Sequence, residues 1–292
     1  MRTAVIGTSG QLALELHRAP RSGHVELLPA ERVDLSDTAA LKAWLDRVKP
    51  GLILNAAAYT AVDRAELETE RAFEVNASGP GALATWAAHN GAALFQVSTD
   101  YVFDGSKTTG YVESDQTGPL NAYGQSKLAG ELAVRRALPR HLILRTSWLF
   151  SSHGQNFVKT MLRLAAERPE LRVVADQHGC PTPAAELARA MLSLAARFAG
   201  GEELRWGTYH FAGAGPTTWR DFAEATVALR ATRTGSRPVV TGIPSSEYPT
   251  PARRPTYSIL DTSRFTRTFG IACEPWQAGL RHVVAELLGG VG

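Results

Sequence analysis

The chain has 292 residues, 44% of them hydrophobic, so it is long enough for one large α/β domain and a smaller one. Its 31 Lys and Arg residues nearly balance its 28 Asp and Glu residues, and the arginines are scattered, which argues against a nucleic-acid-binding protein. The cysteines, Cys180 and Cys273, lie far apart without metal-ligand spacing, which argues against a zinc site and a disulfide scaffold.

The first residues contain neither the charged leader nor the apolar core of a signal peptide. No apolar run approaches the roughly 20 residues that a membrane-spanning helix needs. Because the cysteine usage also fits a reducing compartment, we expect a cytoplasmic protein without a membrane or nucleic-acid partner.

Short apolar runs alternate with helix-compatible sequence through the first half of the chain. These runs lie at residues 3–6, 25–28, 52–54, 92–97 and 141–144. Such alternation is typical of a parallel, doubly wound sheet. The sequence therefore predicts an α/β protein with a Rossmann-type sheet.

The second predicted helix shows clear sequence signals for its start, its buried face and its end. Ser36 is suited to the N-cap position, apolar side chains follow at helical spacing from Leu41 to Val48, and Pro50 with Gly51 ends the pattern. The third predicted strand follows at once, as expected for a short connection in this type of fold.

Beyond residue 150, the pattern predicts a helix at 156–168, a strand at 171–175, a helix at 186–198 and a last core strand at 208–211. The tail is richer in proline and arginine, with an irregular loop at 248–255. We predict two units: a Rossmann domain of residues 1–150 and 171–212, and a smaller C-terminal substrate lobe of residues 151–170 and 213–292.

A glycine-containing turn follows the first strand and leads into a helix. It reads Gly7-Thr-Ser-Gly10-Gln-Leu-Ala13, in which Ala13 replaces the third glycine of a dinucleotide fingerprint. Glycines there let the backbone approach a pyrophosphate, and the helix N-terminus supplies amide donors. Close helix-strand packing is the alternative role of Gly10.

The end of the second strand bears on the cofactor. An NAD-specific site has a carboxylate there for the adenosine ribose, but Ala30 has no such group. Glu31 is able to replace it, whereas Arg32 is suited to the 2′-phosphate of NADPH. We therefore favour NADPH over NADH and expect Asp34 and Leu35 to flank the adenine.

Small and polar residues follow the third and fourth strands, at the edge where open α/β sheets bind ligands. The alanines at 56–58 leave room for a cofactor, although tight packing explains them equally well. Ser98, Thr99, Asp100 and Tyr101 place polar groups at the same edge. We expect these hydroxyls to reach a substrate carbonyl.

Tyr123 and Lys127 stand four residues apart at the start of a predicted helix, so they share one helical face. Alone, such a pair is usually an exposed polar face. With Thr99 ahead of it, the chain resembles the short-chain dehydrogenase/reductase superfamily, in its extended branch acting on nucleotide sugars.

Within that branch, further segments resemble the dTDP-4-dehydrorhamnose reductase family. They occur in order along the chain: 55–58, 98–103, 121–131, 145–148, 156–162, 176–182 and 249–255. The family implies reduction of the 4-keto group of dTDP-6-deoxy-L-lyxo-4-hexulose to dTDP-L-rhamnose, the last step of dTDP-rhamnose biosynthesis. It implies a nucleotide-sugar substrate and NADPH or NADH, and we leave open whether the chain forms a homodimer.

The resemblance also implies roles for individual residues. The catalytic residues are Thr99, Tyr123 and Lys127. The cofactor-binding residues are Gly7, Ser9, Gly10, Gln11, Leu12, Arg32, Asp34, Leu35, Ala56, Ala57, Ala58, Tyr123 and Lys127. The substrate-binding residues are Thr60, Val62, Thr99, Tyr101, Trp148, Asn156 and Arg254, and no metal ligands are implied.

Reduction of a ketone needs a hydride for the carbon and a proton for the oxygen. Tyr123 is the expected proton donor, and the Lys127 ammonium is expected to lower the tyrosine pKa from near 10. Lys127 is also expected to hold the nicotinamide ribose, while Thr99 is expected to hydrogen-bond the carbonyl oxygen.

Three alternatives differ in their chemistry. The related 4,6-dehydratases resemble Thr-Asp-Glu where this chain has Tyr101, which cannot act as the extra carboxylate, so reduction is favoured over dehydration. Nucleotide-sugar 4-epimerases use the same tyrosine and lysine. The regulatory β-subunit of methionine adenosyltransferase also resembles these reductases, yet it binds NADP as a partner protein.

Overall fold

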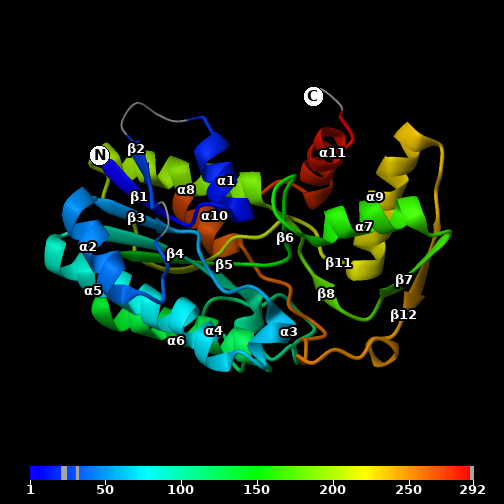
Figure 1. Cartoon of the computed structure of the whole chain (residues 1–292), viewed down its shortest axis with the longest axis horizontal. Helices are drawn as coiled ribbons and strands as arrows, with labels where there is room; N and C mark the ends of the chain where they lie inside the picture. Colours follow the sequence, from blue (N-terminus) through cyan, green and yellow to red (C-terminus); the bar gives the residue numbers. More distant parts are fainter. Residues whose placement is uncertain (21–24, 31–32, 290–292) are drawn as a thin grey trace.

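The computed structural model describes residues 1–20, 25–30 and 33–289. Six parallel strands form the main sheet in the order β10-β5-β4-β3-β1-β2 (Figure 1). They are β1 (Arg2–Ile6), β2 (Glu26–Pro29), β3 (Leu52–Asn55), β4 (Ala93–Thr99), β5 (His141–Thr146) and β10 (Gly207–His210). The predicted Rossmann-type sheet is therefore confirmed, including its last strand.

Two layers of helices cover this sheet (Figure 1). One layer contains α1 (Gln11–Arg18), α8 (Ala184–Ala199) and α10 (Ser263–Phe269), and the other contains α2 (Thr38–Val48), α5 (Gly79–Asn90) and α6 (Ala122–Ala137). Neighbouring strand residues serve opposite cores, as Phe95 packs in the first layer and Leu94 in the second. Burial on both faces explains why the strands are apolar without alternation.

The N-terminus of α2 differs from the prediction. Its N-cap is Asp37, whose carboxylate accepts a hydrogen bond from the Ala40 amide at 2.9 Å, so the assignment of Ser36 is wrong. Ser36 instead donates through its amide and its hydroxyl to Asp34 in the preceding turn. A charged acceptor suits a helix N-terminus, and Asp37 lies next to the first helical residue.

A smaller lobe lies beside the carboxyl ends of the strands, on the right in Figure 1. The strand predicted at 171–175 forms as β7 (Glu170–Val174), but it pairs in parallel with β12 (Val239–Ile243) and not with the main sheet. Its residues alternate between exposed and buried, as in a sheet covered on one side. We assign β7 to the smaller lobe and keep the rest of the predicted division as a proposal.

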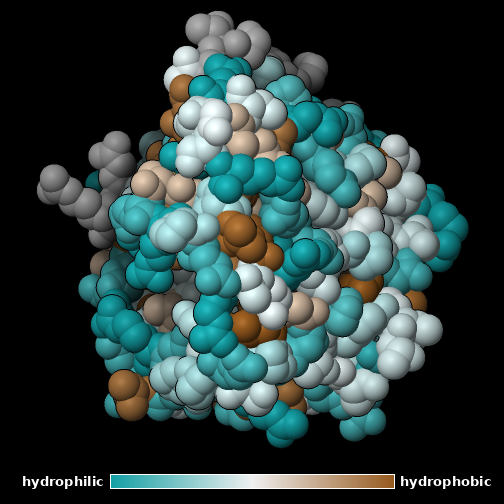
Figure 2. Space-filling model, turned by 90° about the vertical axis from the view of Figure 1, so that its right-hand side faces the viewer, coloured by the Kyte–Doolittle hydropathy of each residue, from teal (hydrophilic) through white to brown (hydrophobic). Residues whose placement is uncertain are grey.

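Two longer helices, α7 (Phe157–Glu167) and α9 (Trp219–Thr234), pack against this pair of strands, and α11 (Trp276–Leu287) packs against α9. The predicted helices at 156–168 and 186–198 are confirmed as α7 and α8. Figure 2 shows the lobe from the right-hand side of Figure 1, where the hydrophobic residues visible among the described ones form small, separate spots.

Short elements complete the chain. Two pairs of two-residue strands form small sheets, in which β6 (Leu149–Phe150) pairs with β9 (Thr182–Pro183) and β8 (His178–Gly179) pairs with β11 (Thr217–Thr218). The remaining elements are α3 (Val62–Ala65), α4 (Thr69–Phe73), the π-helical turn η1 (Glu74–Ser78) and the 3₁₀ turns η2 (Asp100–Val102) and η3 (Ser245–Glu247). The β8–β11 pair brings the first residue of α9 next to the carboxyl edge of the main sheet.

Candidate active site

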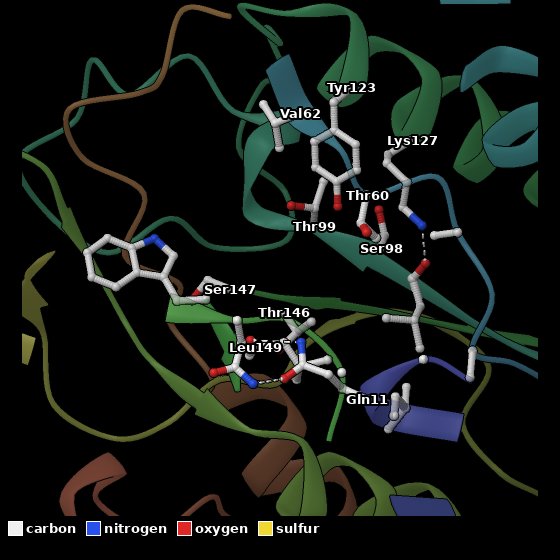
Figure 3. Close-up of a pocket in the computed structure, with 18 of the residues that line it drawn as sticks. Gln11, Thr60, Val62, Ser98, Thr99, Tyr123, Lys127, Thr146, Ser147 and Leu149 are labelled. Atoms are coloured by element: carbon white, nitrogen blue, oxygen red, sulfur yellow. Dashed lines mark hydrogen bonds between the residues drawn. The ribbon is translucent and has the colours of Figure 1, made fainter. Parts of the chain in front are cut away.

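A cavity of about 720 Å³ lies between the carboxyl edge of the sheet and the smaller lobe (Figure 3). Most of the predicted site residues line it. They are Gly7, Ser9, Gly10, Gln11, Leu12, Ala56, Ala57, Ala58, Thr60, Val62, Thr99, Tyr101, Tyr123, Lys127, Trp148, Asn156 and Arg254. The fold therefore brings residues from position 7 to position 254 together around one space.

Other residues line the cavity although the family resemblance implied no role for them, and among these Ser98 and Asp100 were expected at this edge of the sheet. These other residues are Thr8, Val97, Ser98, Asp100, Thr146, Ser147, Leu149, Gly154, Gln155 and Trp219. Thr146 ends β5 and Ser147 follows it, so both could have been predicted from the rule that ligands bind at the carboxyl ends of parallel strands. Trp219 carries no such signal, because long-range contacts place it there, among them the β8–β11 pairing and the packing of its ring on Phe157.

The glycine turn after β1 forms one end of the cavity. Gly7 has a φ of +105°, and a Cβ atom there would lie 3.2 Å from the Ala57 amide nitrogen, so only glycine suits this position. Gln11 begins α1 and donates to the Leu149 carbonyl at 3.3 Å. Asn156 donates to the Gln11 side chain at 2.9 Å, which links the turn to the smaller lobe.

Two predicted cofactor residues, Asp34 and Leu35, do not line the cavity. Arg32 lies outside the described residues. Asp34 pairs with Arg71 at 2.5 Å, and its pKa is lowered first by the hydrogen bond from the Ser36 amide and then by that from Arg71. Leu35 is buried in the core below α5. Their contacts with adenine remain predictions.

Tyr123 and Lys127 lie in the first turns of α6, which begins after Asn121. The Asn121 side chain caps the helix by accepting from the Gly124 amide at 2.8 Å. A Cβ atom on Gly124 would lie 2.2 Å from the Tyr101 carbonyl oxygen, so the glycine allows α6 to approach the end of β4 closely. Both side chains of the predicted pair thus face the cavity (Figure 3).

The Lys127 ammonium group is buried and donates to the Val97 carbonyl at 2.7 Å. Burial lowers the pKa of Lys127 to about 8, which the carboxylate of Glu131 opposes. Glu131 is itself paired with the buried guanidinium of Arg145 at 2.7 Å. A fully buried ion pair therefore lies one turn beyond Lys127 on α6.

The predicted lowering of the Tyr123 pKa is wrong for this structure. Desolvation raises the pKa of Tyr123 to about 12, the charge of Asp100 adds to the rise, and a hydrogen bond with Thr99 opposes it. The Lys127 ammonium is directed to the Val97 carbonyl and makes no resolved contribution. Tyr123 is accordingly a protonated phenol at neutral pH.

Thr99 and Asp100 end β4 as a buried polar pair, exposed by 5% and 2%. The Thr99 hydroxyl donates to Oδ1 of Asp100 at 2.9 Å and accepts from the Tyr101 amide at 3.2 Å. Oδ2 of Asp100 is buried and receives no well-formed hydrogen bond. Desolvation raises the Asp100 pKa to about 7, which the Ser258 and Thr99 hydroxyls oppose.

Trp148 forms part of the opposite wall. Its indole stacks on Trp219 with ring centroids 3.5 Å apart and planes inclined by 8°. A Cβ atom on Gly179 would lie 2.4 Å from this indole, so Gly179 and Trp219 together hold Trp148 in a slot. Trp148 also has a φ of +46°, a strained value for a bulky residue and one that clusters at functional sites.

Arg254 lies in the irregular loop at 248–255 and lines the cavity. Its guanidinium makes a bidentate pair with Asp63 on α3, with contacts of 3.0 and 2.7 Å. Asp63 also accepts from the Ala252 amide, and the Arg254 hydrogen bond is the main reason why its pKa is lowered. The ion pair therefore ties the C-terminal loop to α3.

Two negative findings apply to residues 1–20, 25–30 and 33–289. No three His, Cys, Asp or Glu side chains there gather in a way that would hold a metal ion. No helix in this part of the chain has the length and apolar character required to cross a bilayer.

Comparison with known proteins identifies relatives over the whole chain. The model of the family described as RmlD substrate binding domain matches residues 1–288. A dTDP-4-dehydrorhamnose reductase from Sinorhizobium fredii is 46% identical over 292 residues, which cover 99% of this chain and 98% of the relative.

Solved structures of dTDP-4-dehydrorhamnose reductases are also similar to this chain. A dTDP-4-dehydrorhamnose reductase from Clostridium acetobutylicum is 36% identical with a TM-score of 0.91, covering 99% of this chain and 100% of that one. Another from Bacillus anthracis, in complex with NADP, is 33% identical with a TM-score of 0.89, covering 98% and 99%. The chain belongs to the dTDP-4-dehydrorhamnose reductase family.

Proposed function

We propose that this protein reduces the 4-keto group of dTDP-6-deoxy-L-lyxo-4-hexulose to give dTDP-L-rhamnose, with NADPH as the reductant. The observation that carries the proposal is the convergence of Tyr123, Lys127 and Thr99 on one cavity that extends to the glycine turn of β1. A phenol and an ammonium group beside a dinucleotide site are the groups that ketone reduction needs.

The glycine turn fits a bound dinucleotide. Gly7 packs closely against the Ala57 backbone, the position of a Cβ atom on Gly10 is open, and the N-terminus of α1 offers amide donors to a pyrophosphate. Lys127 has the position to hold the ribose hydroxyls, and the three alanines from Ala56 to Ala58 line the same side. NADPH supplies the hydride when bound. The relative solved with NADP supports NADPH, and NADH is the alternative.

The protein's own residues manage the proton and the substrate. Tyr123 holds a proton at neutral pH and is the proposed donor to the ketone oxygen. Thr99 is the proposed neighbour of that oxygen, although its hydroxyl proton is directed to Asp100. Lys127, beside them, is the proposed contact to the cofactor.

The substrate is proposed to lie against the smaller lobe. The residues proposed around the deoxysugar are Thr60, Val62, Tyr101 and Trp148, and those proposed for the nucleotide diphosphate are Asn156 and Arg254. An indole suits the face of a sugar ring, and a guanidinium suits a diphosphate. Asp63 holds the Arg254 guanidinium by two contacts, which supports an oriented phosphate contact.

A direct assay tests this function. Purified protein is mixed with the keto sugar nucleotide and either NADPH or NADH, and the loss of reduced cofactor is followed together with the formation of dTDP-L-rhamnose. We expect substrate-dependent oxidation of NADPH. A folded protein that binds NADPH and dTDP but oxidises no cofactor would support the regulatory-subunit alternative instead.

Two finer features of the protein belong to the same proposal. We expect a cytoplasmic location, supported by two buried cysteines that are not bridged, Cys180 and Cys273. A homodimer is the other expectation, and light scattering on the purified protein distinguishes it from a monomer.

A further inference from the structure

The pair formed by Thr99 and Asp100 has a property that the proposed reduction does not use. Asp100 is a carboxylic acid at the end of β4, exposed by only 2%, and it lines the same cavity as Tyr123. One of its oxygens is buried without a well-formed hydrogen bond, and the other faces Thr99 at 2.9 Å. A buried, poorly solvated carboxyl group at a reaction centre calls for a chemical explanation.

The hydrogen-bonding capacity of Thr99 restricts what this pair can do. A threonine hydroxyl has one proton and two lone pairs. The Tyr101 amide occupies one lone pair, which leaves one proton and one lone pair for two neighbours, Asp100 and Tyr123. Figure 3 shows the Tyr123 hydroxyl beside Thr99. When the Thr99 hydroxyl accepts a proton from Asp100, it is therefore positioned to donate its own proton to Tyr123, and the reverse also holds.

We propose that Asp100 is the acid that reprotonates Tyr123 after each reduction, with the Thr99 hydroxyl as the relay. Tyr123 first gives its proton to the ketone oxygen and becomes a phenolate. The O–H bond of Asp100 then breaks as an O–H bond forms on Thr99, whose original proton passes to the phenolate oxygen. Asp100 remains as a carboxylate and, after the product leaves, takes up the proton that the reaction consumes from bulk solvent that enters the cavity. This inference rests on the proposed function.

The charges around Asp100 favour this direction of transfer. The ionisable side chains that face it are Tyr101, Tyr123 and Cys180, all neutral at pH 7 because burial raises the pKa of each. No described cation makes a resolved contribution to Asp100, so its proton is retained to a pKa of about 7. With Tyr123 at about 12, transfer from the acid to the phenolate is downhill.

A pre-steady-state experiment separates reprotonation from reduction. Asp100→Asn keeps the size of the side chain and a donor toward Thr99, but it has no proton to lose. We expect one rapid turnover of NADPH oxidation per site, because Tyr123 starts protonated, followed by a steady rate about tenfold or more below wild type. Asp104→Asn removes a carboxylate four residues away and outside the cavity, and it should show no burst.

Thr99 supplies the matched pair of variants. Thr99→Val keeps the shape but removes the hydroxyl, so it should reproduce the burst, whereas Thr99→Ser keeps the hydroxyl and should turn over without one. A steady rate equal to wild type in Asp100→Asn, or equal behaviour of the valine and serine variants, would overturn the relay. Loss of the first turnover in Asp100→Asn would also overturn it, because Asp100 would then act in reduction or binding.

Wild-type protein gives two further tests that do not depend on the variants folding. The burst should be absent at about pH 6 and present at about pH 9, because Asp100 loses its proton as the pH rises through about 7. In the protein without ligands, an infrared carboxyl band should disappear over the same interval. A wild-type burst that does not change with pH, or the absence of such a band, would contradict the proposal. Complete absence of NADPH oxidation would instead refute the proposed function.

Discussion

The two sides of the cavity differ in the charge state of their ionisable side chains. On the side of β4 and α6, Asp100, Tyr123 and Lys127 each have a pKa moved toward the neutral form, with desolvation as the largest cause. On the side of the smaller lobe, Arg254 keeps its charge against Asp63, whose exposed fraction is 39%. A buried group without an ion-pair partner is suited to exchanging protons, and a charged group that is held in an ion pair at the rim is suited to binding an anion.

The largest expected effect tests the proton side of this comparison. Tyr123→Phe removes only the hydroxyl, so turnover should fall by about 10² to 10⁴-fold while NADPH affinity is unchanged. Steady-state kinetics and calorimetry measure the two quantities. Tyr248→Phe is the control, because that tyrosine is 60% exposed and outside the cavity. Near wild-type turnover in Tyr123→Phe would remove this residue as the acid.

Lys127→Met should lower both turnover and NADPH affinity, in contrast to Tyr123→Phe, which should lower turnover alone. Turnover should fall, and NADPH affinity should fall by about 10 to 100-fold because a hydrogen bond from a charged group is lost. In wild type, the affinity should also decline as the pH rises through about 8, where Lys127 loses its charge. An NADPH affinity that Lys127→Met leaves unchanged would show that the lysine acts on the proton alone.

Arg254→Ala tests the rim, where binding and not turnover should respond. We expect dTDP to bind about tenfold more weakly by calorimetry, because a charge-assisted contact to phosphate is lost. Arg253→Ala is a matched control, since the neighbouring arginine is exposed and does not line the cavity. Equal dTDP affinity in Arg254→Ala and wild type would remove Arg254 from the diphosphate site.

The smallest effect is expected from Trp219→Leu, which removes the ring that stacks on Trp148. The KM for the keto sugar should rise about two- to tenfold, the value of an aromatic pair, while NADPH affinity stays constant. Trp219→Phe should lie between the leucine variant and wild type. A change in NADPH affinity as large as that in KM would mean that the stack supports the fold rather than the sugar side.

The strands of the main sheet and the glycine turn could be predicted from the sequence because each depends on local spacing, whereas the Tyr123-Lys127 pair was predicted from the resemblance to a known family. Pairings between segments that are distant in the chain could not be predicted from the sequence. The alternation in β7 does not identify β12 as its partner, and nothing near Trp219 indicates its stack with Trp148. The expected pKa of Tyr123 had the wrong direction, because burial and the contact of Lys127 with Val97 depend on the complete fold.

The pairing of β7 with β12 has a consequence for synthesis on the ribosome. Glu170 pairs with the residue 69 positions later, Val239, so β7 emerges well before its partner exists. At about 5 to 20 residues per second, the interval is roughly 3 to 14 s. During that time, Leu171 and Val173 lack the β12 and α9 residues that later help to bury them. The smaller lobe therefore forms after most of the main sheet, and a chaperone that binds exposed apolar strands would find its site here.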